Sequence, residues 1–333
     1  MKVALIGAGG IGQAHSEAYV LIPEAQIVAV VDVRSENAQK IAKHHGARAY
    51  TSLDEMLKNE KPDMADICTP SYTHKDVSIQ CLDHGLHVLC EKPIAHTLQD
   101  AQAIVQAAQS NHALFMIAQV IRFWPEYAYL KKVYDEKTYG RLLQVFFSRT
   151  SGAPLWAWEN WYIDPKRSGR APFELHIHDA DFIYYLLGRP RQVRSIGYER
   201  VELYASYLKT QFIYDTDVLV EAEGGWFQGP IPFAATYRAV FERATLDYKN
   251  DELLRYLPGE ADPQKVDLSS GVSISTSINL KNAGGIYNEI AYFVNCVKAG
   301  TPPQVITPQE SVDVLSMLLK EIESAKTGHI LDI

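Results

Sequence analysis

The stretch FELHIHDAD, residues 173–181, places two histidines and three carboxylates within nine residues. Such a group could bind a metal ion, move a proton or simply lie on a helix. The residues that follow have apolar side chains at helical spacing and end at Gly188, a residue type that commonly ends helices. We therefore expect a helix that begins near His176.

Helical geometry separates the two histidines of this stretch. At about 100° per residue, His176 lies about 200° from His178, whereas Glu174, His178 and Asp181 fall on one side. Metal chelation from a helix favours histidines four residues apart, so we predict no metal site here. A metal held by one histidine and distant ligands stays an alternative. His176 is expected to be a packed, hydrogen-bonded side chain.

A second set of residues with chemistry lies at the N-terminus. The segment VALIGAGGIGQAHSEAYVLI predicts a buried strand, a glycine turn and a helix, with Gly7, Gly9 and Gly12 in G-x-G-x-x-G spacing. This spacing lets the backbone approach a pyrophosphate at the helix N-terminus. Asp32 ends the next predicted strand, where it can accept hydrogen bonds from an adenosine ribose. The acid favours NAD over NADP, although Arg34 is close enough to keep NADP possible.

The elements that must position these residues alternate along the first third of the chain. Predicted strands and helices follow one another through residue 121, which indicates a parallel, doubly wound sheet. Ligands of such sheets bind at the carboxyl ends of the strands. Lys92 stands at one of these ends, where partial desolvation makes an ammonium group a usable proton donor or charge stabiliser.

The rest of the chain has a different pattern. Long runs with alternating polar and apolar positions, such as LLQVFFSRTSG, predict an open, mainly antiparallel sheet. Amphipathic helices are expected at about 286–298 and 308–327. The polar loop DLSSGVSISTSINLKNAGG is expected to be mobile. The fold class is thus α/β, with an N-terminal Rossmann domain and a C-terminal α+β domain.

Composition excludes several classes of function. The formal net charge of −8 and the absence of a basic run argue against nucleic-acid and membrane partners. The four cysteines are scattered without a CxxC pair, which predicts neither a disulfide framework nor a zinc ribbon and fits a cytoplasmic protein. No apolar run reaches the length of a membrane span, and the first apolar run is too short for a signal peptide.

Several motifs together resemble the Gfo/Idh/MocA family, named for glucose-fructose oxidoreductase, inositol dehydrogenase and a rhizopine catabolism protein. The resemblance covers essentially the whole chain. The motifs are the glycine fingerprint with Asp32, Thr69-Pro70 with His74, Glu91-Lys92-Pro93, Arg122-Phe123 with Pro125, FELHIHDADFIYYLLG and the tail from Tyr287 to Gly328. The resemblance implies an NAD(P)-binding domain over residues 1–121. It also implies a substrate-binding and oligomerisation domain over 122–333, whose C-terminal helix can pack back on the first domain.

The resemblance also implies site residues. The residues expected to bind the cofactor are Gly7, Gly9, Gly10, Ile11, Gly12, Asp32, Arg34, Thr69, Pro70, His74, Glu91, Lys92 and Gln119. Those expected to bind substrate are Lys92, Arg122, Trp161, Glu174, His178 and Tyr287. The catalytic residues would be Lys92, His178 and Glu174, with Lys92 between the substrate hydroxyl and the nicotinamide, and a cis peptide before Pro93 would aim the lysine.

The family pattern D-x-x-x-H maps onto Glu174 and His178. An imidazole titrates near neutrality, so His178 can take the hydroxyl proton while the neighbouring carboxylate orients it. Glu174 departs from the family aspartate by one methylene. It can still orient His178, but different substrate geometry and a redirected proton path stay open.

The hypothesis is an NAD(P)-dependent oxidoreductase that interconverts a secondary alcohol and a ketone on a sugar, inositol or related polyol. A second hypothesis keeps the cofactor bound and oxidises the substrate transiently for dehydration, epimerisation or glycoside cleavage. A third is a non-catalytic regulator that binds NAD(H). The resemblance further implies a homodimer or homotetramer through the outer face of the C-terminal sheet.

Overall fold

The computed structural model describes residues 1–268 and 284–333. The predicted polar loop lies almost entirely outside the described residues. The chain divides into two compact units, which are described separately below. As far as the described residues go, unit 1 comprises 1–123 with 284–313, and unit 2 comprises 124–268 with 314–333. The helix α10 (Pro308–Thr327) carries residues of both units.

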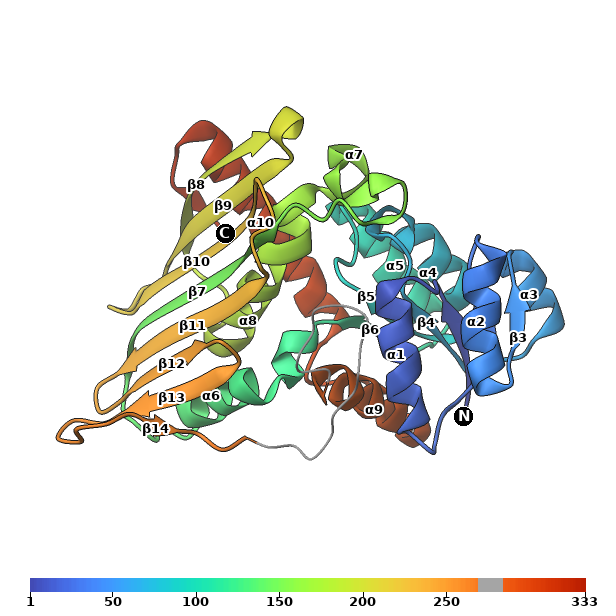
Figure 1. Cartoon of the computed structure of the whole chain (residues 1–333), viewed down its shortest axis with the longest axis horizontal. Helices are drawn as coiled ribbons and strands as arrows, with labels where there is room; N and C mark the ends of the chain where they lie inside the picture. Colours follow the sequence, from blue (N-terminus) through green and yellow to red (C-terminus); the bar gives the residue numbers. More distant parts are fainter. Residues whose placement is uncertain (269–283) are drawn as a thin grey trace. The chain divides into compact units, whose positions relative to one another are not determined.

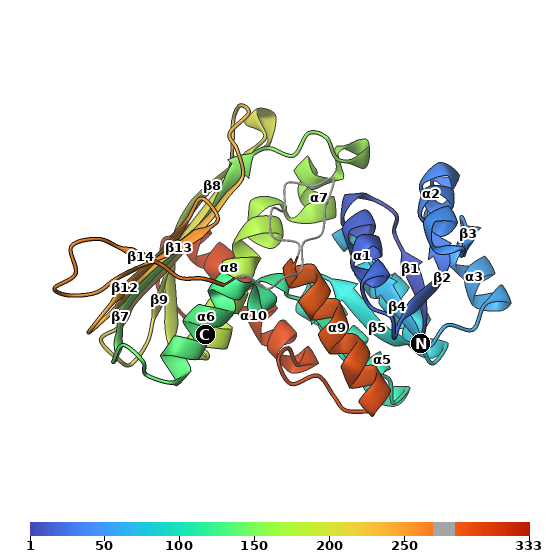
Figure 2. The same cartoon turned by 60° about the horizontal axis from the view of Figure 1, so that its bottom comes forward.

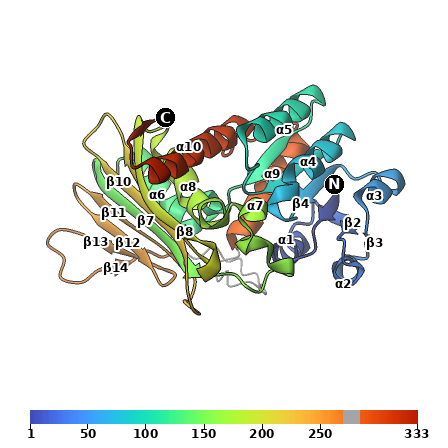
Figure 3. The same cartoon turned by 90° about the horizontal axis from the view of Figure 1, so that it is seen from above.

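Unit 1 is built on a six-stranded parallel sheet of order β3-β2-β1-β4-β5-β6 (Figure 1). Its elements are β1 (Lys2–Ile6), α1 (Gly10–Val20), β2 (Gln26–Val31), α2 (Ser35–His45), β3 (Arg48–Tyr50), α3 (Leu53–Asn59), β4 (Met64–Ile67), α4 (His74–Asp83), β5 (His87–Glu91), α5 (Leu98–Ser110), β6 (Phe115–Ala118) and α9 (Gly284–Ala299), with short 3-10 turns at Ser71–Thr73 and Val120–Phe123. The strands are almost entirely buried because helices cover both faces, with α4 and α5 on one side and α1 and α2 on the other (Figure 3). This confirms the predicted doubly wound sheet.

The strand order of unit 1 decides where its loops gather. The order reverses between β1 and β4, which places the loops after these two strands beside each other at the carboxyl edge of the sheet. The apolar face of α9 packs on this unit, since Ile286, Ile290 and Phe293 belong to the same buried core as Ala14 and Ala18 of α1.

Unit 2 contains a nine-stranded sheet of order β14-β13-β12-β11-β7-β10-β9-β8-β15. Its elements are α6 (Pro125–Asp135), β7 (Leu142–Gly152), the 3-10 helix η3 (Trp158–Ile163), α7 (Pro165–Ser168), the π-helix η4 (Pro172–His176), α8 (Ile177–Leu187), β8 (Gln192–Arg200), a 3-10 turn at Val201–Leu203, β9 (Ala205–Ile213), β10 (Leu219–Phe227), β11 (Ala234–Phe241), β12 (Thr245–Lys249), β13 (Glu252–Tyr256), β14 (Gln264–Lys265) and β15 (Leu331–Asp332). All neighbouring pairs are antiparallel except β7 and β10, which are parallel. The prediction of a mainly antiparallel sheet is confirmed.

Helices cover one face of this sheet. Figure 2 shows α6 and α8 along one side of the strands. Beneath them, Tyr127, Phe147, Phe182 and Tyr237 form a buried aromatic cluster, with ring centroids 4.9 to 6.1 Å apart for the contacts of Tyr127. The rings pack mostly edge to face, an arrangement that brings the positive edge of one ring against the negative face of another. Among the helices of the described residues, none has both the length and the apolar character that a bilayer crossing requires.

Candidate functional site

The glycine turn of unit 1 has the shape that a pyrophosphate needs. Gly7 has a φ of +98°, and a β-carbon at Gly12 would overlap the carbonyl oxygen of Gly7. No heavy atom lies within 4 Å of the position that a β-carbon on Gly9 would take. Gly9 caps α1 without a side-chain hydrogen bond, and the first turn of the helix contains no acid. The open N-terminus of α1 therefore fits a bound anion.

Asp32 is fixed beside this turn. The carboxylate is 8% exposed, and its Oδ2 accepts a hydrogen bond of 2.8 Å from the Ala8 amide. Its Oδ1 accepts from the backbone amide of Arg34 at 2.8 Å and from the Arg34 Nε at 3.3 Å. A hydrogen bond thus connects the glycine turn with Asp32, the residue predicted to accept hydrogen bonds from the ribose. This arrangement fits a dinucleotide, and the guanidinium beside the carboxylate partly offsets its negative charge.

His74 links the loops that follow β4 and β5. Its Nδ1 lies 2.8 Å from the carbonyl oxygen of Pro93, and its Nε2 lies 2.9 Å from that of Thr69. Burial lowers the pKa of His74, although the two carbonyl contacts oppose this effect. Both ring nitrogens contact protein atoms, so the structure shows His74 as a brace between loops. The roles of Thr69, Pro70 and His74 in cofactor binding stay predictions.

Lys92 follows β5 at the carboxyl edge of the sheet, where the sequence placed it. The residue is half-buried, and the peptide bond between Lys92 and Pro93 is cis. Its backbone amide donates a hydrogen bond of 3.1 Å to Oε2 of Glu91, which is 9% exposed. Burial raises the pKa of the Glu91 carboxyl, but the hydrogen bond from His15 and nearby positive charges outweigh it and lower the pKa below its ordinary value. Glu91 is therefore an anion that holds the backbone of Lys92.

Three further predicted residues of unit 1 lie near the end of β6 or on α9. Gln119 is 2% exposed, directly after β6. Arg122 donates a hydrogen bond of 2.5 Å to the carbonyl oxygen of Val305 and lies 3.5 Å from the Glu310 carboxylate. It therefore connects the turn after β6 with the segment before α10 and with the first turn of α10. Tyr287 is half-buried against the core of unit 1. Their binding roles stay predictions.

In unit 2, the predicted helix start near His176 is confirmed, but the residues directly before it form a different type of helix. Residues Pro172–His176 form a π-helix, and α8 begins at Ile177. Because Glu174 lies in the π-helix and His178 lies in α8, a uniform spacing of about 100° per residue does not apply between them, and the placement of both on one side stays a prediction. The segment packs directly on β10, because a β-carbon at Gly224 would come within 2.6 Å of the His176 side chain. Tertiary packing accommodates the wider turn, a feature that is frequent at functional sites.

The two histidines of this segment have different surroundings. His176 is fully buried, and its Nε2 lies 2.6 Å from the Glu321 carboxylate on α10, which is also fully buried. This confirms the prediction of a packed, hydrogen-bonded histidine. His178 is half-buried, whereas Glu174 is 5% exposed and Asp181 is fully buried. The catalytic roles of His178 and Glu174 stay predictions.

Trp161 belongs to an aromatic group in unit 2. It lies in η3 and stacks on Tyr162 with ring centroids 4.0 Å apart and an interplanar angle of 28°. Tyr162 also contacts Trp226 of β10 at 6.0 Å, edge to face. Two residues of η3, Glu159 and Asn160, have positive φ angles of 49° and 51°, a conformation that tertiary contacts must support. Substrate contact by Trp161 stays a prediction.

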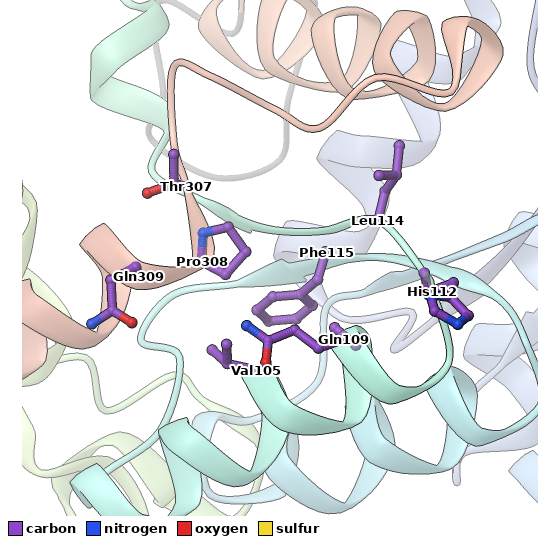
Figure 4. Close-up of a pocket in the computed structure, with 10 residues that line it drawn as sticks. Val105, Gln109, His112, Leu114, Phe115, Thr307, Pro308 and Gln309 are labelled. Atoms are coloured by element: carbon purple, nitrogen blue, oxygen red, sulfur yellow. The ribbon is translucent and has the colours of Figure 1, made fainter.

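A groove of about 470 Å³ lies elsewhere in unit 1 (Figure 4). Gln109 and His112 near the end of α5 line one side, Leu114 lies at the start of β6, and Thr307 and Pro308 line the other side. The start of β6 is at the amino edge of the parallel sheet, opposite the loops that carry Gly7 and Lys92. The groove therefore does not belong to the predicted cofactor site.

Two buried residues that no sequence pattern identified lie next to the predicted site, and one of them contacts Glu91. His15 of α1 and Asp66 of β4 are fully buried, and the Nδ1 of His15 lies 2.9 Å from Asp66 Oδ2. Asp66 interrupts the apolar run MADI, which is buried at every position. A carboxylate in a buried parallel strand requires a partner, and that signal could have been used. The partner itself could not be identified from spacing.

Two protein-family models match this chain. Residues 1–119 match a family described as an oxidoreductase family with an NAD-binding Rossmann fold, and residues 127–228 match the GFO/IDH/MocA C-terminal domain. The chain belongs to the Gfo/Idh/MocA family. The match of this family's NAD-binding domain to unit 1 supports the interpretation of the glycine turn and Asp32 as a dinucleotide site.

Two relatives illustrate the degree of similarity between this chain and named proteins. A 2,7-anhydro-N-acetylneuraminate hydratase from Mediterraneibacter gnavus is 31% identical over 195 residues, 58% of this chain and 51% of that protein. A glucose-6-phosphate 3-dehydrogenase from Bacillus subtilis is 29% identical over 189 residues, 56% of this chain and 53% of that protein. The chain thus spans about half the length of these curated relatives.

A solved structure has a fold similar to that of this chain. A levoglucosan dehydrogenase in complex with NADH and levoglucosan matches with a TM-score of 0.87, covering 100% of this chain and 99% of that one. The two sequences are 18% identical, so the match shows a shared fold.

Proposed function

We propose that this protein is an NAD(P)-dependent oxidoreductase that interconverts a secondary alcohol and a ketone on a sugar, inositol or related polyol. One observation supports this proposal most. The open glycine turn, the fixed Asp32 carboxylate and Lys92 all lie at strand ends of the same parallel sheet, in a chain that belongs to an NAD-binding oxidoreductase family. When bound, NAD+ supplies a hydride acceptor for the substrate carbon.

The chain's own residues handle the oxygen and its proton. In the oxidation direction, the carbon loses hydride while the hydroxyl loses its proton, and the C–O single bond becomes a carbonyl. We assign the proton to His178, because an imidazole can both accept and return it near neutral pH. Lys92 stabilises the charge that develops on the oxygen, since an ammonium in a partly desolvated position interacts strongly with an oxyanion. Glu174 orients the imidazole and stabilises its cation.

A panel of sugars and polyols tests this proposal. The purified protein is incubated with each substrate and with NAD+ or NADP+, and absorbance is followed at the reduced-nicotinamide band. At least one secondary alcohol is expected to give sustained absorbance, with a ketone as the product. Binding of NADH without turnover of any panel member would instead support the non-catalytic regulator.

The hydratase relative gives the second hypothesis an observation in its favour. A hydratase adds or removes water without net oxidation or reduction, so a cofactor that oxidises the substrate transiently in such a reaction must return to its starting state. Net release of reduced cofactor distinguishes the two hypotheses. One equivalent of NADH per product supports the dehydrogenase, whereas product without NADH release supports dehydration, epimerisation or glycoside cleavage.

Asp32 is predicted to set the choice of cofactor. Its carboxylate repels a 2′-phosphate, so Asp32→Ser should shift the ratio of kcat/KM for NADP+ to that for NAD+ upward by about 10-fold or more. Asp63→Ser is the matched control, because Asp63 also accepts a backbone hydrogen bond, from Lys2 at 2.6 Å, but lies at the opposite sheet edge. An unchanged ratio in Asp32→Ser would contradict the assignment.

Partners and assembly follow from the same proposal. We propose a small-molecule polyol or sugar substrate and a homodimer or homotetramer formed through the C-terminal sheet. Ile196 and Tyr198 of β8 and Leu219 of β10 leave 63%, 41% and 56% of their surface exposed in the single chain, which suits a protein–protein surface. The cytoplasmic location likewise stays a prediction.

A further inference from the structure

A buried ionic cluster lies beneath the carboxyl edge of the unit 1 sheet. It joins His15 of α1, Asp66 of β4 and Glu91 at the end of β5. The His15 Nδ1 lies 2.9 and 3.1 Å from the two oxygens of Asp66, and its Nε2 lies 3.2 Å from Oε1 of Glu91. A neutral imidazole has one N–H and could donate to only one of these carboxylates. The geometry therefore favours an imidazolium that donates to both.

The surrounding groups agree with this charge state. Burial is the largest single effect and lowers the pKa of His15, but the charge and hydrogen bonds of Asp66 and Cys68 together outweigh it and raise the pKa well above its ordinary value. The remaining titratable neighbours stay neutral, because burial raises the pKa of the Cys68 thiol and of the Tyr19 hydroxyl. Glu91 is further stabilised as an anion by the charge of Lys92. The cluster thus holds one cation between two anions, without water access to His15.

We propose that His15 is a positioning residue for Lys92. Through Nε2 it holds one oxygen of Glu91, and the other oxygen of Glu91 accepts the backbone N–H of Lys92 at 3.1 Å. His15 lies on the same helix whose N-terminal turn forms the glycine cradle. One side chain therefore joins the helix of the cofactor fingerprint to the strand end that carries the lysine. The inference rests on the proposed function, because His15 acts through Lys92.

A metal site is the competing interpretation of this cluster. Ligand atoms of His15, Asp66 and Cys68 all lie within 4.8 Å of one another. Metal binding would require a neutral imidazole and a thiolate. The raised pKa values of His15 and Cys68 instead favour the protonated imidazole and the neutral thiol. The imidazole nitrogens also already contact two carboxylates. A protonated His15 that donates hydrogen bonds to both carboxylates therefore fits the cluster better than a bound metal ion does.

The test replaces His15 by glutamine, which keeps one donor but cannot carry a charge. With a polyol that the wild-type protein oxidises, His15→Gln is expected to lower kcat by about 10-fold, while the Kd for NADH stays within about threefold. His45→Gln is the matched control. His45 is also bonded to α1, through the Ser16 hydroxyl at 2.7 Å, but it is not part of the cluster. Its kcat should equal that of the wild-type protein.

A pH series separates positioning from simple structural support. The folded-state pKa of His15 lies above the unfolded value of about 6.5, so its stabilisation is complete below that value and is lost as pH rises through the folded pKa. The difference in thermal midpoint between wild type and His15→Gln should therefore be largest near pH 6 and shrink toward pH 9. As the pH rises through the folded-state pKa of His15, the kcat of the wild type should fall relative to that of the variant.

Three outcomes would overturn the proposal. The first is a lower thermal midpoint in His15→Gln with kcat unchanged, which would make the cluster purely structural. The second is one equivalent of zinc per chain whose removal by a chelator abolishes activity. The third is full wild-type kcat in Asp66→Asn, the variant to be measured if His15→Gln does not fold. Failure of the proposed function is distinct, because it would show as unchanged turnover in a Lys92 variant.

Discussion

Replacement of Lys92 by methionine is expected to lower kcat for the polyol substrate by about 10³-fold. Methionine keeps the length and most of the volume of the side chain but has no charge and no proton. Lys92 stands at the carboxyl end of β5, directly after a buried carboxylate that holds its backbone amide. Loss of the ammonium therefore removes charge stabilisation from the developing oxyanion without releasing the loop. The measurement is kcat and KM from initial rates of reduced-cofactor formation.

Two controls make this result specific. Lys75→Met applies the same substitution to a lysine of unit 1 that pairs with Asp100 at 3.0 Å, and it should leave kcat unchanged. The Kd for NADH in Lys92→Met should change far less than kcat, because the glycine turn and Asp32, which carry most of the predicted cofactor contacts, do not change. If Lys92→Met and His178→Ala each kept wild-type turnover of a verified substrate, the assigned mechanism would be wrong.

The architecture of unit 1 was predictable because each of its elements is locally consistent. Buried strands such as Val3–Ile6 are short apolar runs, and a glycine, proline or polar loop separates each from the helix after it. In unit 2, alternation predicted β7, β8, β10, β11 and β12, but it predicted neither the short strands β13, β14 and β15 nor β9 (Ala205–Ile213). Its buried residues Leu208, Thr210 and Phe212 alternate with half-buried ones, so the signal is present. The polar Thr210 at a core position weakens it.

The site was predictable only as far as it is local in sequence. The glycine spacing, Asp32 and Lys92 each follow a strand directly, and strand ends of a parallel sheet share one edge. The π-helix at Pro172–His176 was not predictable, because spacing arguments assume a uniform helical turn. The sequence also could not identify which residues pair with the buried charged side chains. Glu321 lies 145 residues from His176, and neither residue type nor spacing identifies that pair.

A second large effect is expected from Asp179, the residue next to His178. Its carboxylate accepts two hydrogen bonds from Arg149, from Nε and Nη2, each of 3.0 Å, and both side chains are buried. Asp179 raises the pKa of Arg149, although burial acts in the opposite direction, so the guanidinium stays charged. Asp179→Ala would leave that charge buried without a carboxylate. We expect a loss of about 3 to 5 kcal/mol in the free energy of unfolding of unit 2.

Amide hydrogen exchange measures this loss where it occurs. Exchange protection should fall in β7, which carries Arg149, and in α8, which carries Asp179, while β1 and β4 of unit 1 serve as internal references. Asp135→Ala is the matched control, because Asp135 pairs with Lys131 at the surface and its loss should lower the free energy of unfolding by less than about 0.5 kcal/mol.

Arg149→Met combined with Asp179→Leu should recover part of the stability, since two apolar side chains leave no unpaired charge. Equal protection in Asp179→Ala and Asp135→Ala would show that the aromatic cluster around Tyr127, and not the ion pair, holds β7 to α8.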